Sequence, residues 1–321
     1  MKYICAQPAI KYFAWQIDVF IYSLINNNVN QNDIHIISAI PENGIDSYFS
    51  TLQEKYPEVL FEFYIDDRSY KQYQPSIKPH LAYKHYLKHP ELQKENILLL
   101  DSDIVITKPL NFKGMLNDNI WYLSDTSSYL NYDYIKSKGD DVLNKMLEVA
   151  NISEHVIKSQ NNNSGGAQYL IKSVDAIYWK EVEDLSHRLY IELLAMYSRK
   201  PPEEAGNYGL QIWTSEMWAM IWVAWKKGIM TLTHPELDFC WATDEIEKWN
   251  QTKIFHNAGV TCGCQNLFKK SNCTDKLPDL NLEIDALIYA KQLDIDHAEA
   301  ILRVEKGSSV SKMSSKEIKS D

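Results

Sequence analysis

Arginine is scarce in this chain: its 321 residues include only four, namely Arg68, Arg188, Arg199 and Arg303. Lysine and arginine together number 33 against 43 aspartates and glutamates, which gives a net charge of −10 at pH 7. A protein that wraps around nucleic acid needs a concentrated basic surface for the phosphates. The composition therefore disfavours a nucleic-acid-wrapping protein, although it is compatible with a local basic groove.

Long hydrophobic runs are also missing, although 45% of the residues are hydrophobic. No stretch approaches the roughly 20 apolar residues of a membrane span. The first residues, MKYICAQPAI, lack the apolar core and cleavage site of a signal peptide. Five cysteines, an odd number, favour reduced thiols over a disulfide framework. We therefore expect a cytoplasmic protein without a membrane span.

The sequence also lacks a Gly-X-Gly-X-X-Gly loop, since Ala6-Gln7-Pro8 closes the first predicted strand, and this disfavours a nicotinamide dinucleotide. Strands alternate with helices through the first hundred residues, which predicts an α/β, Rossmann-like fold with a mostly parallel sheet flanked by helices. The predicted strands are Lys2–Ala6, Asp33–Ala39, Val59–Ile65 and the run that ends at Asp101. The predicted helices are Tyr12–Ile25, Tyr48–Tyr56 and Pro79–Leu87.

The remainder of the chain is less regular. Trp218, Trp222 and Trp225 share one face of a predicted helix, a spacing typical of core residues. The further predicted elements are a strand at Trp121–Ser124, a helix at Asp141–Ala150, a glycine-containing turn and apolar segment at Asn161–Ile171, the tryptophan helix at Thr214–Lys227, and a short strand and glycine turn at Lys253–Val260. We expect one domain over residues 1–280, with a nucleotide-binding half (1–125) and an acceptor half (126–280), then a C-terminal helix (281–304) and a disordered tail (305–321).

The stretch Asn96–Phe112, NILLLDSDIVITKPLNF, organises the rest of the chain. Its apolar run is typical of a strand buried on both faces. Side chains alternate along an extended chain, so Asp101 and Asp103 are expected on one side, with Cα atoms about 6–7 Å apart. Such carboxylates repel each other unless a positive charge lies between them, and a divalent cation that carries a diphosphate would supply it. A solvated turn is the alternative for so short a motif.

The segment Asp101-Ser102-Asp103 resembles the Asp-X-Asp signature of nucleotide-sugar glycosyltransferases of the GT-A type. Further segments resemble, in the same order, the plant peptidyl-serine α-galactosyltransferases and hydroxyproline O-arabinosyltransferases, which share one domain type. These segments are Tyr73–Pro79, Leu98–Pro109, Gly165–Gln168, Thr214–Met217 and Phe255–Gly259. Those plant enzymes have membrane anchors, which this sequence does not show, and the acceptor side around Tyr122–Tyr134 does not align.

The resemblance implies a GT-A fold and a retaining, metal-dependent transfer of a sugar from a UDP-sugar to a hydroxyl acceptor. The residues implied as ligands of Mn²⁺ or Mg²⁺ are Asp101, Asp103 and His256. Those implied to contact the donor are Ala6, Gln7, Lys78, Ser102, Gly165, Gly166 and Ala167. Gln168 and Glu216 are implied as catalytic residues beside the sugar. The departing phosphate oxygen would help to deprotonate the acceptor.

Two other functions remain open from the sequence. The abundance of Asn, Ile, Lys and Tyr suggests an AT-rich, viral genome and a host-cytoplasmic enzyme that glycosylates hydroxymethylated DNA bases. In that hypothesis nucleic acid is an acceptor only, and a lysine groove beside Asp103 would support it. The other is a non-catalytic glycan-binding module, with Trp213, Trp218 and Trp241 stacked on sugar rings.

Overall fold

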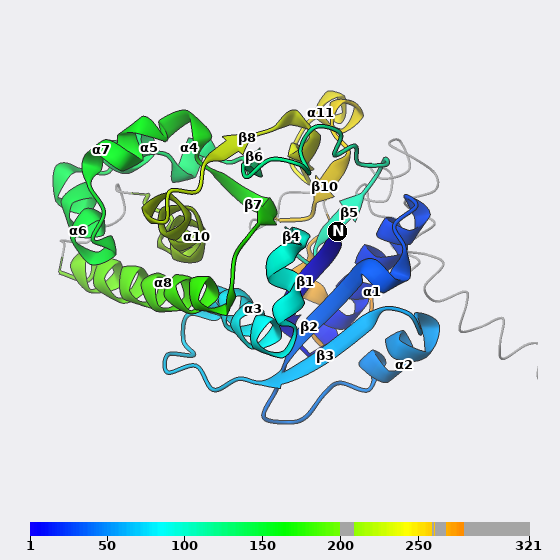
Figure 1. Ribbon diagram of the computed structural model, residues 1–321. Coiled ribbons are helices and arrows are strands. Elements are labelled where there is room, and N and C mark those ends of the chain that lie inside the picture. The colour runs from blue at the N-terminus through cyan, green and yellow to red at the C-terminus, as the bar shows by residue number, and fades with distance from the viewer. Residues whose placement is uncertain (200–208, 259, 261–267, 279–321) are drawn as a thin grey trace, which may run out of the picture.

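The computed structural model describes residues 1–199, 209–258, 260 and 268–278, and its centre is a seven-stranded mixed sheet (Figure 1). The strand order is β3-β2-β1-β4-β7-β6-β8. The strands are β1 (Lys2–Pro8), β2 (Ile34–Ile40), β3 (Leu60–Ile65), β4 (Asn96–Leu100), β6 (Trp121–Asp125), β7 (Gly165–Lys172) and β8 (Thr231–Thr233). Strand β7 is antiparallel to both of its neighbours, and the other pairs are parallel. The predicted mostly parallel α/β fold is confirmed.

Helices cover both faces of this sheet, as Figure 1 shows. One face packs against α1 (Lys11–Asn26) and α2 (Tyr48–Lys55). The other packs against α3 (Ile77–Lys88), α8 (Ala176–Tyr197) and α10 (Ser215–Lys226). Figure 1 shows α10 ringed by α8 and by α4 (Ser127–Leu130), α5 (Tyr132–Ser137), α6 (Asp140–Ala150) and α7 (Glu154–Ser159). No helix within the described ranges is long and apolar enough to cross a membrane.

Strand β4 is buried on both faces, as its sequence predicts. Ile97 and Leu99 pack into the core that contains α8 and α10, whereas Leu98 and Leu100 pack into the core that contains α1. Burying four aliphatic side chains contributes about 1.5–3 kcal/mol each. The strand is therefore a rigid base for the residues that follow it.

A second, smaller sheet follows from the chain that leaves β4. It consists of β5 (Ile104–Ile106), β10 (Ile254–His256) and β9 (Phe239–Trp241), with β10 in the middle. Strand β10 is antiparallel to β5 and parallel to β9. Because β10 pairs with β5, this sheet brings His256 close to the carboxyl end of β4.

Other sequence predictions have mixed outcomes. Trp218, Trp222 and Trp225 are all buried in the core, as their spacing predicts. Helix α8, with 22 residues, was not predicted, although it is the long partner of α10. The strand expected within Lys253–Val260 is limited to β10. The C-terminal helix at 281–304 and the tail at 305–321 lie outside the described residues.

Two buried histidines lie between the sheet and α3. Nδ1 of His35 on β2 is 2.9 Å from Nε2 of His85 on α3, and the Tyr64 hydroxyl is 2.8 Å from His85 Nδ1. Burial lowers the pKa of His35 from 6.5 to about 4, helped by the charge of Lys2. Burial and the neighbouring His35 lower the pKa of His85 to about 2. Both imidazoles are therefore neutral in the folded protein at neutral pH.

Acidification should destabilise the protein through these histidines. Below pH 6.5 the unfolded chain binds protons at His35 and His85 that the folded chain does not, so stability is complete above that pH and falls down to about pH 4 for His35 and about pH 2 for His85. At pH 5 the loss should be about 2 kcal/mol for each histidine. Urea unfolding at pH 7.5 and pH 5 measures it, and the exposed His155→Gln variant should show the same loss. A free energy of unfolding that is equal at both pH values would contradict the expectation.

Candidate metal and nucleotide site

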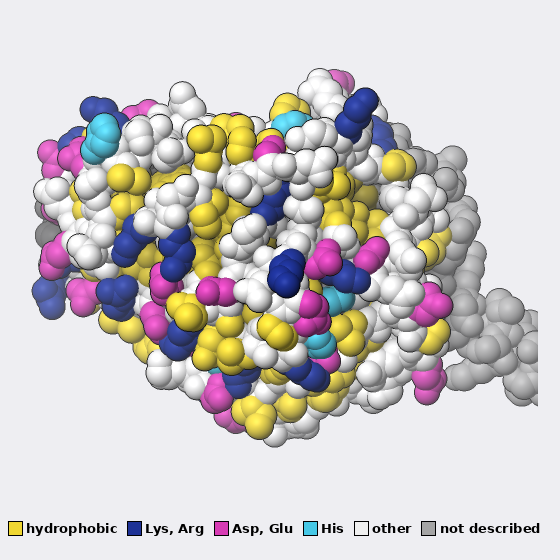
Figure 2. All heavy atoms as spheres, viewed as in Figure 1, with side chains coloured by type: hydrophobic (Ala, Val, Ile, Leu, Met, Phe, Trp, Pro, Cys, Tyr) yellow, Lys and Arg dark blue, Asp and Glu magenta, His cyan; other side chains and the backbone are white. Residues whose placement is uncertain are grey.

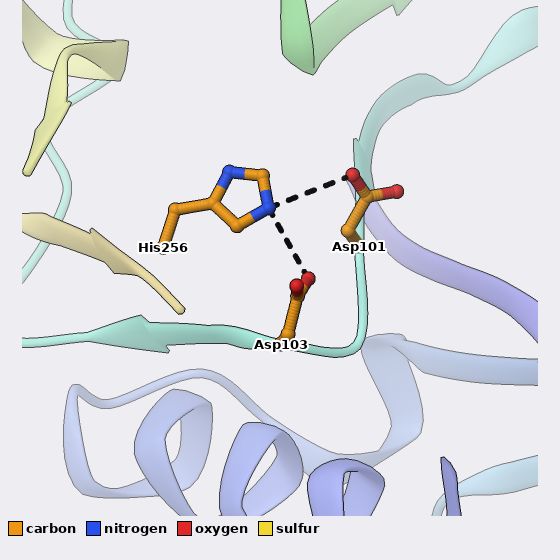
Figure 3. A group of neighbouring side chains, drawn as sticks. All are labelled: Asp101, Asp103 and His256. Atoms are coloured by element: carbon orange, nitrogen blue, oxygen red, sulfur yellow. Dashed lines mark ion pairs between the residues drawn. The ribbon is translucent and has the colours of Figure 1, made fainter. Parts of the chain in front are cut away.

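Asp101 and Asp103 lie on a turn and not on one extended strand (Figure 3). Strand β4 ends at Leu100, and β5 begins at Ile104. The expectation of a single extended run through both aspartates is therefore wrong. The turn is held by the backbone N–H of Asn257, which donates a hydrogen bond of 2.9 Å to the Asp103 carbonyl. The folded turn, and not strand alternation, points both carboxylates to one place.

His256 approaches the carboxylates of Asp101 and Asp103 from the opposite side (Figure 3). It ends β10, where its Cα is the register partner of Ile104, directly after the turn. Its Nε2 lies 3.2 Å from Asp103 Oδ1 and 3.9 Å from Asp101 Oδ2. The imidazole stacks on Trp241, with ring centroids 5.0 Å apart and an angle of 25° between the planes. The ring is thereby held with Nε2 toward the carboxylates.

The donor set fits a divalent cation. One ligand atom from each of Asp101, Asp103 and His256 lies within 4.8 Å of the others. Two carboxylate oxygens and one imidazole nitrogen suit Mn²⁺, whereas Mg²⁺ prefers oxygen ligands and usually keeps several waters. The residues present therefore fit Mn²⁺ better than Mg²⁺.

Two lysines already balance the aspartates. Lys78 Nζ lies 2.8 Å from Asp101 Oδ1, and Lys270 pairs with Asp103. Burial alone would raise the pKa of Asp103, but His256 and Lys270 outweigh burial and hold that pKa well below its usual range. The nearness of the carboxylates alone therefore does not require a metal ion, contrary to the sequence argument. The support for a metal is the convergence of three suitable ligand atoms.

Lys78 extends the site toward a buried glutamate. It lies in the first turn of α3, where the helix dipole disfavours a cation. Its Nζ is 3.6 Å from Glu216 Oε2, in the first turn of α10. Burial alone would lower the pKa of Lys78, but the carboxylates of Asp101 and Glu216 raise it, so the ammonium is charged. A cation with only 12% of its side chain exposed at a helix amino terminus breaks a local rule, which is typical of functional positions.

Tyr73 holds Glu216 in position, a role that sequence reasoning missed although Tyr73 begins one of the motif segments. Its hydroxyl accepts a 2.7 Å hydrogen bond from the Glu216 backbone N–H and donates one of 2.7 Å to the Trp213 carbonyl. Burial raises the pKa of Tyr73, so the hydroxyl stays protonated. Arg68 donates a hydrogen bond of 2.9 Å to the Tyr73 carbonyl. Glu216 is therefore fixed through its backbone.

The segment Gly165–Gln168 is the start of β7 and not a loop, so that expectation is wrong. Its register with β6 shifts: Asp125 pairs with Gly165, and Leu123 pairs with Tyr169. Three residues of β7 therefore face a single residue of β6. Such a bulge bends a strand and re-aims its side chains, often beside a functional site.

The bulge explains the residue types within it. A Cβ on Gly165 would collide with the backbone carbonyl of Ser124, so the glycine permits close packing of β6 and β7. Ala167 has a φ of +69°, a left-handed conformation that strains a residue with a side chain. Gln168 is fully buried, and its Oε1 accepts a hydrogen bond from Ser124 Oγ. The strain at Ala167 lies two residues from the register partner of Leu99 in β4.

The other residues predicted to contact the donor, Ala6, Gln7 and Ser102, are all buried but differ in their hydrogen bonds. Gln7 is buried at the end of β1 and accepts a hydrogen bond from Cys5 Sγ at 2.9 Å. Ala6 belongs to the apolar core. Ser102 is buried and donates a hydrogen bond of 3.4 Å to Gln16 Oε1 on α1. The Ser102 hydroxyl therefore already has a partner on α1.

Several predicted site residues carry buried polar atoms with no hydrogen-bond partner among the described residues. These atoms are Gln7 Nε2, Gln168 Nε2, Glu216 Oε1 and His256 Nδ1. The strand registers bring the end of β1 and the start of β7 to either side of the carboxyl end of β4. Because buried polar groups are nearly always paired in folded proteins, the unpaired amides of Gln7 and Gln168 beside the end of β4 support a polar ligand there, whereas His256 Nδ1 points away from the two carboxylates (Figure 3).

Lys270 is the site residue for which the sequence carries no signal. It begins a short 3₁₀ helix, Lys270–Cys273, which is tied to α1 by a hydrogen bond of 3.2 Å from Trp15 Nε1 to the Cys273 carbonyl. Nothing in the local sequence Lys269-Lys270-Ser271 distinguishes it from a solvated pair of lysines. Only the fold places its ammonium group against Asp103.

No protein-family model and no curated protein matches the sequence. Among solved structures, the chain is similar to the apo structure of the WbbM bifunctional glycosyltransferase, with 13% identity and a TM-score of 0.47 over 80% of this chain and 45% of that one. The chain thus spans less than half of that structure. It is also similar to apo mouse xyloside xylosyltransferase 1, with 10% identity and a TM-score of 0.38 over 82% of this chain and 98% of that one.

The surface shown in Figure 2 carries charges of both signs. On this face, lysine and arginine side chains are interspersed with aspartates and glutamates, and the part of the chain that the structure describes forms no continuous basic stripe there. Such a stripe is the electrostatic footprint of duplex DNA binding. This face therefore offers no groove of the kind that the DNA-modifying hypothesis needs.

Proposed function

We propose that the chain is a metal-dependent glycosyltransferase that moves a sugar from a UDP-sugar to a hydroxyl acceptor. The observation that carries this proposal is the convergence of Asp101, Asp103 and His256 beside Lys78 and the buried Glu216. The Asp-X-Asp resemblance in the sequence adds the nucleotide-sugar donor. The unpaired buried atoms Gln7 Nε2, Gln168 Nε2 and Glu216 Oε1 support a ligand with hydroxyl or phosphate oxygens.

The leaving diphosphate would be bound by charge. Asp101, Asp103 and His256 would hold Mn²⁺, which when bound neutralises the charge that develops on the diphosphate as the sugar departs. Lys78 would keep one ammonium hydrogen on Asp101 and direct another to a phosphate oxygen. A charged donor fixed before the reaction stabilises developing negative charge without reorganisation.

The donor sugar would lie between β7 and α10. Gln168 presents an unpaired Nε2, and Glu216 presents an unpaired Oε1, so both can hydrogen-bond to sugar hydroxyls. We propose retention of the anomeric configuration, with the acceptor proton taken by the departing phosphate oxygen on the same face. The carboxylate of Glu216, already 3.6 Å from Lys78, would steady positive charge on the sugar ring.

We also propose that residues 1–280 work as one domain. Both sheets take strands from the expected nucleotide half and from the expected acceptor half: β7 and β8 complete the large sheet, and β9 and β10 complete the small one. The candidate metal ligands come from both halves for the same reason. A chain cut at residue 125 would therefore lose the site.

Calorimetric titration of UDP into the purified full-length protein tests the proposal. Binding in the presence of Mn²⁺ that disappears with EDTA is the expected result, since the diphosphate and the three protein ligands would share the ion. Equal binding in both conditions would keep a nucleotide site but remove Asp101, Asp103 and His256 from the metal role. A complete absence of binding with Mn²⁺ would overturn the proposed function.

A further inference from the structure

A cavity of about 310 Å³ lies between the end of β6, α4 and β9. Its lining includes Asp125, Asp238, Phe239, Trp241, Asp244 and Lys248. Small-molecule pockets in proteins have volumes of about 300–1,000 Å³, so the cavity has room for a small ligand or for the end of a longer one. None of these six residues is a candidate metal ligand or a predicted donor contact.

The first wall of this cavity is shared with that site. Trp241 is the register partner of His256 and stacks on its imidazole. Phe239 also contacts that imidazole, with ring centroids 5.4 Å apart. The cavity therefore shares two aromatic side chains with the surroundings of the candidate metal ligand His256.

The second wall, α4, also connects the cavity with the aspartates. Ser127 and Ser128 line the cavity, and Tyr129 follows them. Burial raises the pKa of Tyr129, and the charges of Asp101 and Asp125 both add to that rise. Tyr129 thus lies within electrostatic reach of a cavity carboxylate and of a candidate metal ligand.

The chemistry of the lining selects among possible ligands. Three aspartates, Asp125, Asp238 and Asp244, and one lysine, Lys248, line the cavity, so the lining has an excess of acidic residues. Carboxylates accept hydrogen bonds from hydroxyl groups, and the Trp241 ring offers an apolar surface with a polar edge. Phosphodiesters would be repelled there. An uncharged polyhydroxylated ligand fits all of these features.

We propose that this cavity binds the acceptor, and that the acceptor is an uncharged glycan end and not a nucleic acid. That the ligand is an acceptor rests on the proposed function, whereas the cavity and its preference for sugar hydroxyls follow from the lining residues alone. Asp125 and Asp238 would accept hydrogen bonds from acceptor hydroxyls, and Trp241 would offer an apolar surface to the sugar ring.

Ligand-observed saturation-transfer NMR on the full chain tests this inference. The probes are the methyl glycosides of glucose, galactose and xylose, with a thymidine dinucleotide as the charged comparison. UDP is present with Mg²⁺, which replaces Mn²⁺ because the paramagnetic Mn²⁺ would broaden the NMR signals. At least one glycoside should bind to the wild-type protein. Asp125→Asn and Asp238→Asn should each weaken that binding about tenfold or more, because each removes a hydrogen bond to a charged group. Asp184→Asn, exposed on α8, is the matched control and should bind as the wild type does.

The outcomes separate this inference from the proposed function. Unchanged UDP binding with Mn²⁺ in both cavity variants, together with weakened glycoside binding, is the expected result. Glycoside binding that is equal in the wild type and both variants, absent from the wild type, or weaker than dinucleotide binding overturns the inference. Glycoside binding that depends on Asp125 and Asp238 in a protein that never binds UDP overturns the proposed function alone.

Discussion

Asp103→Asn should abolish sugar transfer while the protein stays folded. The asparagine keeps the shape of the side chain but removes the charge that would bind the metal ion, at the point nearest His256 Nε2. Loss of one group that stabilises developing charge costs about 100- to 1,000-fold in rate, and the loss of a metal ligand should cost at least that much. Lys270, which is partly exposed, can turn to solvent when its partner is lost.

The measurement is the initial rate of sugar release from the donor identified by UDP-sugar screening, with circular dichroism as the check on folding. Asp184→Asn replaces an exposed aspartate on α8 and should keep the full rate. Full activity of Asp103→Asn would show that the metal assignment is wrong. An Asp103→Asn protein that binds UDP equally with Mn²⁺ and with EDTA would agree with the expected loss of the ion.

Lys78→Met should destabilise the protein by about 3 kcal/mol, because it leaves the buried Glu216 without its positive partner. The methionine fills similar space, so the effect reports the charge and not a cavity. Burial raises the pKa of Glu216 and Lys78 opposes that rise, so removal of the lysine favours the protonated carboxyl group. The same variant should lose sugar transfer, since Lys78 would no longer reach the diphosphate.

A double-mutant cycle separates the two roles of Lys78. Lys78→Met combined with Glu216→Gln removes both charges of this pair and should recover part of the lost stability, since only the partly exposed Asp101 then lacks its lysine partner. Activity should stay absent in the double variant. Equal urea midpoints for the wild type and Lys78→Met would contradict the buried pair, and full activity of the double variant would remove both residues from the mechanism.

The sequence predicted those parts of the fold that depend on local pattern. The run from Ile97 to Leu100 is apolar at every position, which specifies a strand buried on both faces, and the structure has it. The three tryptophans of α10 follow helical spacing and are core. Trp218 is therefore unavailable for sugar stacking, whereas Trp213 is 58% exposed. Periodicity thus located the tryptophans on a helix face, but burial decided between their possible roles.

Helix α8 could have been predicted. Val182, Leu185, Leu189 and Leu193 recur at helical intervals and are all buried, and the side chain of Asp175 caps the amino terminus. The missed signal was local, in contrast to the site contacts of Tyr73 and Lys270. Those contacts join residues 143 and 167 positions apart in the chain. No spacing rule reaches that far, so only the folded chain shows them.

The motif Asp101-Ser102-Asp103 is an intermediate case. Its residue types predicted a cluster of ligand atoms, and the described chain contains one with His256. The predicted extended conformation of this motif was wrong, because the turn depends on a hydrogen bond from Asn257, which lies far along the chain. The residue types in this motif therefore predicted the ligand cluster even though the predicted backbone conformation was wrong. Whether the cluster binds a metal stays a prediction.

The placement of β10 has a consequence for the order of events during synthesis. All seven strands of the large sheet have been made once the ribosome passes Thr233, whereas β5 must wait for β10, about 150 residues after its own synthesis. Domains form from the amino terminus as the chain emerges. A nascent chain that ends before His256 can thus contain the whole main sheet while its two aspartates still lack the imidazole. The strands of the main sheet are therefore all synthesised before the third candidate metal ligand, His256, is added to the chain.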